Sequence, residues 1–354
     1  MGATNSTGNK TTWPTVFTAL LSGQSLGNAE AVWAMDQIMS GEASPAQVAG
    51  FLMALRAKGE TVDEMRGLAD TMLAHASRIE VAGTTLDIVG TGGDRAHTVN
   101  ISTMASLVAA ACGVRVVKHG NRASSSSSGS ADVLEALGIN LSLPPSAVVS
   151  VAEKAGITFC FALQFHPAMR HAASARRDLG IGTAFNFLGP LTNPAQPTYA
   201  AVGVADARMA PLIAGVFAER RKDAAVFRGD DGLDELTIST TSKVWWVRGG
   251  VVREYEVDPT SVGLDLNPVE TLRGADAAHN AQVVRDVFAG APGPIRDAVV
   301  LNAGVALALT VPDRGESQTD FIRALRSGMD RAGAAIDDGS ATSVLHRWVA
   351  ATKA

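Results

Sequence analysis

The sequence is poor in aromatic residues, in charge and in cysteine, and each shortage excludes a class of protein. Aromatic side chains make up 5% of the 354 residues and charged side chains 18%, whereas apolar residues make up 46%. The chain can therefore build a sizeable core and lacks the composition of a disordered protein. Its formal net charge of -5 provides no basic excess for binding nucleic acid or an anionic membrane.

Cysteine is scarce, because Cys112 and Cys160 are the only two in the sequence. Two cysteines cannot build a disulfide framework, and each lies in an apolar run that is typical of a buried thiol. No apolar run reaches the roughly 18 residues that a membrane span needs. The polar segment 1–12 lacks the features of a secretory signal peptide. We therefore expect a cytoplasmic protein with a disordered leader at 1–12.

Helical spacing dominates the first part of the chain. Two capping boxes, Ser44 with Gln47 and Thr61 with Glu64, each precede apolar residues that recur at helical intervals. No strand pattern accompanies them. Residues 13–82 are therefore predicted to form a small helical domain.

From residue 83 onward, short buried strands alternate with helices, and this rhythm predicts a mostly parallel sheet covered by helices. The expected strands lie at 86–89, 114–117, 157–162, 199–204 and 224–227, followed by a hairpin of 243–248 and 251–257 around Gly249-Gly250. A helix is also expected at 166–179. The predicted fold class is α/β: a small N-terminal all-helical domain, joined by helices from about 176–200, and a larger α/β domain at 83–354.

A glycine-rich loop, Gly90 to Asp94, follows the first expected strand and precedes a helix that starts near Ser102. Glycines let backbone N–H groups approach an anion, and a helix N-terminus favours negative charge. The loop is not a dinucleotide fingerprint, because Arg95 occupies the third glycine position, and it is not a P-loop. It indicates either phosphate binding or a glycine-rich turn without a ligand.

A second polar loop, Lys118-His119-Gly120-Asn121-Arg122 with serines to Ser130, follows the next strand. Ligands of open parallel sheets bind beyond the carboxyl ends of the strands. Lys118 and Arg122 add positive charge, so two such loops favour a ligand with more than one phosphate. A solvated serine-rich linker is the alternative. His119 fits a loop histidine, a hydrogen-bond donor or a base.

Clustered carboxylates follow another buried strand, in Asp230-Asp231-Gly232-Leu233-Asp234-Glu235. Mg²⁺ is commonly held by one or two carboxylates together with substrate phosphates and waters. The spacing does not match an EF-hand. The cluster predicts either a Mg²⁺ site or an acidic surface turn.

Two arginines, Arg176 and Arg177, end an expected helix before the segment from Phe185 to Pro194. Cations suit the C-terminal end of a helix dipole. Alternatively, one of them binds a substrate carboxylate through its planar guanidinium group. The spacing alone does not choose between these roles.

Four motifs, in their order along the chain, resemble those of the anthranilate phosphoribosyltransferase family. They are Gly90-Thr91-Gly92-Gly93-Asp94, Lys118-His119-Gly120-Asn121-Arg122, Phe185-Asn186 through Asn193-Pro194, and Asp231-Gly232-Leu233-Asp234-Glu235. The stretch Gly293-Pro294-Ile295-Arg296-Asp297 through Leu301-Asn302-Ala303 also fits, so the resemblance runs from about Trp13 to Trp348.

The resemblance implies transfer of the 5-phosphoribosyl group of 5-phosphoribosyl 1-pyrophosphate (PRPP) to the amine of anthranilate. The products would be N-(5-phosphoribosyl)anthranilate and pyrophosphate, in the second committed step of tryptophan biosynthesis. The resemblance also implies Mg²⁺ as the cofactor, with two ions bound together with PRPP. It implies a homodimer joined through the helical domain, with no nucleic-acid or membrane partner.

Site residues follow from the same resemblance, position by position. Those implied to bind PRPP are Gly90, Thr91, Gly93, Asp94, Thr98, Asn100, Ile101, Ser102, Thr103, Lys118, Asn121, Arg122, Ala123, Ser124, Ser125, Ser126 and Ser130. Those implied for anthranilate are Gly90, Asn121 and Arg176, with Arg176 on the carboxylate. Ser102, Asp234 and Glu235 are implied as Mg²⁺ ligands, and His119, Asn121 and Arg176 as the catalytic group, with His119 near the amine. Gly182 and the serine run 124–128 depart from the family's usual residues.

Two other functions fit parts of the pattern. A pyrimidine nucleoside phosphorylase would share the fold and a similar lysine-histidine loop, but Gly92, Gly93 and Asp94 are contiguous here. The pair Asp234 and Glu235 also suits Mg²⁺-pyrophosphate better than free phosphate. A non-enzymatic nucleic-acid-binding relative would need a basic face, which the net charge of -5 does not favour.

Overall fold

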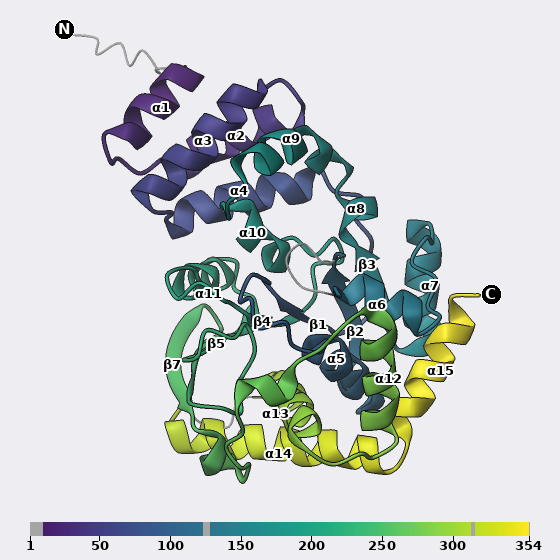
Figure 1. Cartoon of the computed structure of the whole chain (residues 1–354). Coiled ribbons are helices and arrows are strands. Elements are labelled where there is room, and N and C mark those ends of the chain that lie inside the picture. The colour runs from purple at the N-terminus through teal and green to yellow at the C-terminus, as the bar shows by residue number, and fades with distance from the viewer. Residues whose placement is uncertain (1–9, 123–127, 313–315, 354) are drawn as a thin grey trace, which may run out of the picture. The chain divides into compact units, whose positions relative to one another are not determined.

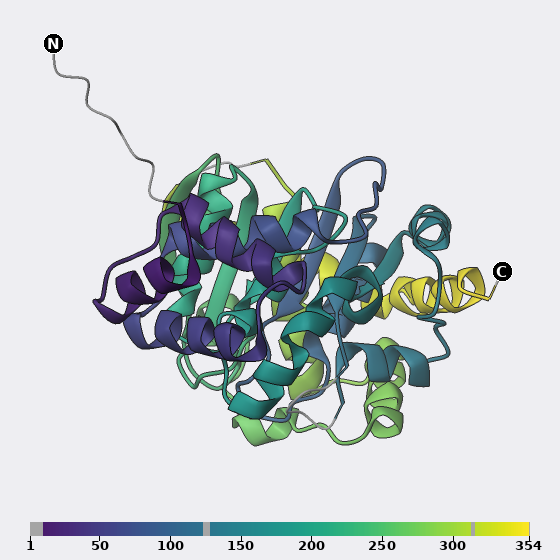
Figure 2. The same ribbon diagram turned by 90° about the horizontal axis from the view of Figure 1, so that it is seen from above.

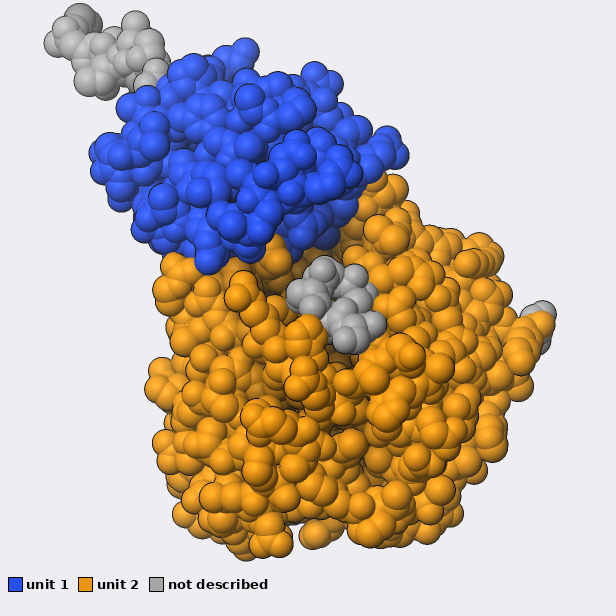
Figure 3. All heavy atoms as spheres, viewed as in Figure 1, with its two compact units in different colours: residues 1–75, 168–185 blue, residues 76–167, 186–354 orange. Residues whose placement is uncertain are grey.

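The computed structural model describes residues 10–122, 128–312 and 316–353 of the chain. It divides into two compact units, one of residues 1–75 and 168–185 and one of residues 76–167 and 186–354 (Figure 3). The expected organisation had the helical part end at 82 and return at about 176–200. The returning segment comes earlier in the structure, because the chain leaves the second unit soon after its third strand.

The helices of the first unit begin at residues that the sequence marks as caps. In the described residues they are α1 (Trp13–Leu21), α2 (Asn28–Met39), α3 (Pro45–Lys58), α4 (Val62–Ala74) and α9 (Arg170–Leu179) (Figure 1). Both predicted capping boxes are confirmed, since Ser44 and Thr61 each accept a hydrogen bond from a backbone N–H one turn later. Helix α2 packs along α4, and α3 contacts both α1 and α9; Figure 2 shows these helices from above.

The leader expected at 1–12 does not include Thr12. Residues 1–9 lie outside the described part of the chain, but Thr12 is the N-cap of α1 and its side chain accepts a hydrogen bond from the backbone N–H of Thr15. Just inside this helix, Trp13 is buried against the rings of Trp33 and Phe51. Thr12 therefore belongs to the folded helical unit.

The helix expected at 166–179 is interrupted. A short helix, α8 (Ala162–Phe165), ends at His166, a 3₁₀ turn covers Pro167–Met169, and α9 begins at Arg170. Proline has no N–H to donate and its ring clashes with the preceding turn. Pro167 therefore separates α8 from α9, which lies in the other unit.

A seven-stranded sheet forms the centre of the second unit, with the order β3-β2-β1-β4-β5-β6-β7. Strands β1 to β5 pair in parallel, and β6 and β7 add an antiparallel hairpin. The strands are β1 (Thr85–Gly90), β2 (Arg115–Gly120), β3 (Ile157–Phe161), β4 (Tyr199–Gly203), β5 (Asp223–Gly229), β6 (Ser242–Arg248) and β7 (Val251–Val257). The predicted fold class and the predicted hairpin are confirmed. Gly249 and Gly250, at the turn, have φ of 56° and 86° and suit a tight hairpin.

Helices cover this sheet and pack on one another. Those described are α5 (Ile101–Ala111), α6 (Ser130–Ala136), α7 (Pro145–Ala155), α11 (Met209–Glu219), α12 (Ala277–Phe288), α13 (Pro294–Leu309), α14 (Gln318–Asp337) and α15 (Ser340–Ala351). Helix α11 packs on β5 and β6, whereas α13 contacts β4, β5, α5 and α14 (Figure 1). Within the described residues, no helix is both long enough and apolar enough to cross a membrane.

The sheet order decides which loops meet. β1 lies between β2 and β4, all three running in the same direction, so the loops after Gly90, Gly120 and Gly203 leave one edge of the sheet. Parallel α/β sheets bind ligands at this edge. The two polar loops of the sequence analysis therefore start from adjacent strand ends.

Candidate active site

The glycine-rich loop after β1 has the backbone of an anion-binding turn. Gly92 and Gly93 have φ of 69° and 90°, and Arg95 and His97 also lie in the left-handed region. Non-glycine residues rarely adopt this conformation, and such outliers concentrate at functional loops. Helix α5 follows, and its N-cap, Asn100, makes no side-chain cap. The loop thus places backbone N–H groups beside a helix N-terminus, as phosphate sites do.

The carboxylate pair is held directly against this loop. Gly92 N donates to Asp234 Oδ2 at 2.6 Å, and Ser102 N donates to Glu235 Oε1 at 3.2 Å. Any side chain at Gly90 or Gly203 would collide with Asp234. Asp234 and Glu235 are buried, so they do not form the exposed acidic turn of the alternative reading. The three predicted metal ligands, Ser102, Asp234 and Glu235, are brought together.

Burial and mutual repulsion shift the acidity of these groups. Burial, with the neighbouring charge of Asp94, raises the pKa of Asp234 to about 8. Burial and the charge of Asp234 raise the pKa of Glu235 well above its usual value. Buried carboxylates in contact become charged readily only when a cation is close. The donor set therefore fits a divalent cation.

The chemistry of that cation follows from the number of ligands. Within residues 10–122, 128–312 and 316–353, no group of three or more histidine, cysteine, aspartate or glutamate side chains could hold a metal ion. Ca²⁺ and Zn²⁺ sites usually have several protein ligands. Mg²⁺ instead keeps waters and takes substrate phosphates, and two carboxylates with a serine hydroxyl suit it.

Lys118 lies beneath the loop as a wholly buried cation in β2. Its Nζ donates to the Ile88 carbonyl and to Ser102 Oγ, at 3.3 Å in the second case. Burial lowers the pKa of Lys118, and the charges of Asp87 and Glu235 oppose that shift. A positive charge between the loop strand and α5 is well placed to stabilise a bound phosphate.

Sequence reasoning missed a buried network around Asp87. The Asp87 carboxylate accepts hydrogen bonds from His119 N at 3.1 Å and Asn193 Nδ2 at 2.8 Å, and the same amide donates to the Val117 carbonyl. Burial raises the pKa of Asp87 to about 6, although the charge of Lys118 opposes this. The signal was present: an aspartate inside an otherwise apolar parallel strand needs such partners.

His119 is a neutral histidine in which only one of the two ring nitrogens has a hydrogen-bond partner. Its Nδ1 lies 3.0 Å from the Gly189 carbonyl, so Nδ1 carries the proton and Nε2 is an acceptor. Nε2 is buried and has no hydrogen-bond partner in the described residues. Burial, together with the adjacent His166 ring, lowers the pKa of His119 to about 3. These contacts leave Nε2 free to accept a hydrogen bond, a role that differs from the loop histidine, donor and base considered from the sequence.

The second loop is only partly described. Ala123, Ser124, Ser125 and Ser126 lie outside the described residues. Asn100 Nδ2 donates to the Ser128 carbonyl, so the end of this loop is tied to the N-terminus of α5. Arg122 forms ion pairs with Asp132 and Glu135 of α6. Its charge is therefore already shared with carboxylates.

The remaining predicted residues lie between the glycine-rich loop and α5, in α5 itself, at the start of α6 and in α9. Thr98 pairs with Arg273, Ile101 and Thr103 are buried in α5, and Ser130 begins α6. Arg176 belongs to the first unit, in the last turn of α9, and its guanidinium lies over the Phe185 ring at 5.4 Å. Burial lowers the pKa of Arg176.

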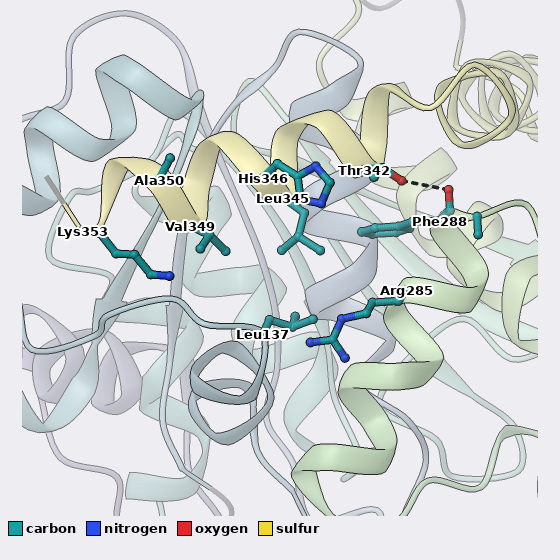
Figure 4. Close-up of a pocket in the computed structure, with 10 residues that line it drawn as sticks. Leu137, Arg285, Phe288, Thr342, Leu345, His346, Val349, Ala350 and Lys353 are labelled. Atoms are coloured by element: carbon teal, nitrogen blue, oxygen red, sulfur yellow. Dashed lines mark hydrogen bonds between the residues drawn. The ribbon is translucent and has the colours of Figure 1, made fainter.

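A cavity of about 580 Å³ lies elsewhere in the second unit. Apolar side chains of α12, α15 and the end of α6 line it, with Arg285, His346 and Lys353 among them (Figure 4). None of the predicted site residues lines this cavity. Size alone therefore does not locate the candidate site.

Comparison with known proteins connects this geometry to a family. Residues 14–76 match the helical bundle domain, and residues 82–342 the a/b domain, of the glycosyl transferase family. Anthranilate phosphoribosyltransferase of Nocardioides sp. is 61% identical over 96% of this chain and 99% of the relative. That of Streptomyces griseus is 60% identical over 97% of this chain and 96% of the relative.

Solved structures agree with the curated relatives. Anthranilate phosphoribosyltransferase from Thermus thermophilus superposes with a TM-score of 0.88 at 39% identity, covering 96% of this chain and 99% of that one. The Saccharomyces cerevisiae enzyme, in complex with PRPP and Mg, superposes with a TM-score of 0.87 at 26% identity, covering 97% and 98%. These matches extend over both units, and the chain belongs to the anthranilate phosphoribosyltransferase family.

Proposed function

We propose that this chain transfers the 5-phosphoribosyl group of PRPP to the amine of anthranilate, releasing pyrophosphate. One observation carries the proposal: Asp234 and Glu235 are buried against the backbone N–H groups of Gly92 and Ser102. This arrangement is suited to a pyrophosphate that arrives with Mg²⁺. The family membership supplies the identity of the two substrates.

The leaving pyrophosphate sets the main task of the site. As the bond between C1 of the ribose and the pyrophosphate oxygen breaks, negative charge grows on the leaving group and the ribosyl carbon becomes cation-like. Mg²⁺ would neutralise part of the charge on the phosphates when bound by Asp234, Glu235 and Ser102. The backbone N–H of Gly93, with the buried Lys118, would stabilise the rest, since the N–H of Gly92 already donates to Asp234.

Anthranilate brings its own nucleophile, so the protein needs to orient it rather than form a covalent intermediate. The acceptor Nε2 of His119 would take a hydrogen bond from the anthranilate amine. Arg176 would bind the carboxylate through its planar guanidinium, which stacking on Phe185 already holds in one orientation. Gly90 and Asn121 would complete the anthranilate site.

Finer features of the proposal rest on the family resemblance or on single observations. The family resemblance alone supports two Mg²⁺ ions, because the described residues hold no group of three acidic, histidine or cysteine side chains that could bind a metal. The family resemblance supports a homodimer formed through the helical unit. The free thiols suit the reducing cytoplasm, where tryptophan biosynthesis would use the product.

The test is the loss of anthranilate fluorescence when protein, PRPP and Mg²⁺ are combined. We expect a decay that requires all three, with equimolar release of pyrophosphate. A parallel reaction with pyrimidine nucleosides and phosphate checks for phosphorolysis. Absence of the decay in folded protein, or phosphorolysis in its place, would refute the proposal.

A further inference from the structure

Asn302 is a wholly buried amide in the middle of α13. Its Oδ1 accepts a hydrogen bond from Leu236 N at 2.9 Å, and its Nδ2 donates to the Leu236 carbonyl at 2.9 Å. The same Nδ2 also donates to the Ala298 carbonyl, one turn earlier in the helix, at 2.9 Å. A single side chain thus pairs with both backbone groups of one residue in a loop.

Leu236 directly follows Asp234 and Glu235 in the sequence, so the contact with Asn302 fixes the peptide next to the carboxylate pair. The segment between β5 and β6 has no strand partner of its own. Its first half is tied internally, since Asp231 accepts hydrogen bonds from Thr237 and Ser239. Asn302 instead connects the peptide next to Glu235 with a different layer of the domain.

Helix α13 is a rigid base for this contact. It packs on β4, β5, α5 and α14. The backbones of α13 and α14 touch closely where Gly304 meets Gly328, because a side chain at Gly328 would collide with the Gly304 carbonyl. Gly304 is two residues from Asn302, so α13 cannot slide along its neighbour without a clash.

From these contacts we propose that Asn302 is the positioning residue of the carboxylate pair. It holds the peptide after Glu235 at a set distance from the glycine-rich loop, and thereby orients Asp234 and Glu235 toward the Mg²⁺–PRPP complex. Outer contacts of this kind commonly change metal affinity or activity by about 10- to 100-fold. The inference rests on the proposed function.

The presence of an asparagine at position 302 indicates that this residue orients the Leu236 peptide and does not serve stability alone. A leucine of similar volume would suit the core of α13, where the surrounding positions are apolar. A leucine there would nevertheless leave the backbone N–H and carbonyl of Leu236 without their partner, because only one side of the contact changes. An amide at position 302 instead dictates where one particular peptide must lie.

The test compares Asn302→Leu with Leu309→Ala, which removes buried volume from the same helix without touching Leu236. Binding of PRPP is measured by calorimetry at several Mg²⁺ concentrations, without anthranilate and therefore without turnover. We expect Asn302→Leu to raise the half-saturating Mg²⁺ concentration about tenfold or more. The KM for anthranilate should change less than twofold, since no anthranilate contact is altered.

Leu309→Ala should lower the melting temperature and leave the Mg²⁺ dependence unchanged. If Asn302→Leu does not fold, Asn302→Ala replaces it, because water can then pair with Leu236 in the space left. Equal Mg²⁺ dependence in parent and Asn302 variants would overturn the inference. So would an equal shift in Leu309→Ala. If the parent protein itself showed no Mg²⁺-dependent PRPP binding, the proposed function would be refuted. The parent measurement therefore distinguishes failure of the proposed function from failure of the Asn302 inference.

Discussion

The carboxylate of Asp87 in β1 accepts a hydrogen bond from the backbone N–H of His119 in β2, 3.1 Å away. This contact links the strand that leads into the glycine-rich loop with the strand that carries the candidate catalytic histidine. Asn193 completes the network from a third segment. The two loops of the candidate site are therefore coupled beneath the sheet edge.

The raised pKa of Asp87 predicts how stability depends on pH. The folded pKa of about 6 lies above the usual 3.8 of an aspartate, so the folded state binds this proton more tightly than the unfolded state. Asp87 therefore contributes roughly 3 kcal/mol to the free energy of unfolding below pH 4. This contribution is lost as the pH rises to about 6. Urea unfolding between pH 4 and pH 7 measures it. Asp87→Asn should flatten this part of the profile, and an unchanged slope would contradict the assignment.

Removing the charges of the carboxylate pair should abolish Mg²⁺-dependent turnover while sparing the fold. Asp234→Asn with Glu235→Gln is expected to lower kcat/KM by about 10²-fold or more. Because both groups have raised pKa values, neutral amides should leave the melting temperature at pH 8 unchanged or higher. Full activity in the double variant would mean that the pair is a structural turn.

His119 should act as a neutral hydrogen-bond acceptor throughout the physiological range. With its pKa lowered to about 3, it contributes no ionisation between pH 5 and pH 8. His119→Ala is expected to reduce kcat/KM for anthranilate by about 10²-fold without removing an inflection from the pH–rate profile. His119→Gln, which restores an acceptor oxygen, is the matched control and should recover part of the rate. An inflection near pH 6.5 that disappears in His119→Ala would show that the histidine titrates.

Arg176 should affect one substrate more than the other. Arg176→Ala removes the proposed carboxylate contact, so the KM for anthranilate should rise about tenfold or more, since charge-assisted pairs contribute roughly 1.5–3 kcal/mol. The KM for PRPP should change little. Arg176→Lys keeps the charge but loses the planar stacking on Phe185. Its KM for anthranilate should therefore lie between that of the parent protein and that of Arg176→Ala. An unchanged KM for anthranilate in Arg176→Ala would exclude this role.

Local signals in the sequence predicted several elements well. Ser44 and Thr61 were placed correctly as helix caps, because capping depends on residues three positions apart. The Gly249-Gly250 turn was likewise readable, since only a left-handed backbone closes so short a hairpin. The helix expected at 166–179 was wrong at its start, where Pro167 outweighed the apparent helical pattern.

Interactions between distant residues were harder to foresee. Asp87 and Asn193 are 106 positions apart, and Leu236 and Asn302 are 66 apart. No periodicity relates such pairs, although a charged residue in a buried strand and an asparagine in an apolar helix each implied an unseen partner. The ion pairs that Arg122 forms with Asp132 and Glu135 of α6 were also not anticipated, because its motif suggested only a phosphate contact.

By itself, the sequence determined which segments are helix or strand and which loops carry glycine, basic or acidic residues, because spacing and backbone preference are local properties. The tertiary structure alone decided that Asp234 and Glu235 are buried against Gly92 and Ser102, that Lys118 lies beneath them, and that Asn302 holds the adjoining peptide. Burial and hydrogen-bond partners depend on strand order and helix packing. They set the protonation and direction of each side chain only once the chain has folded.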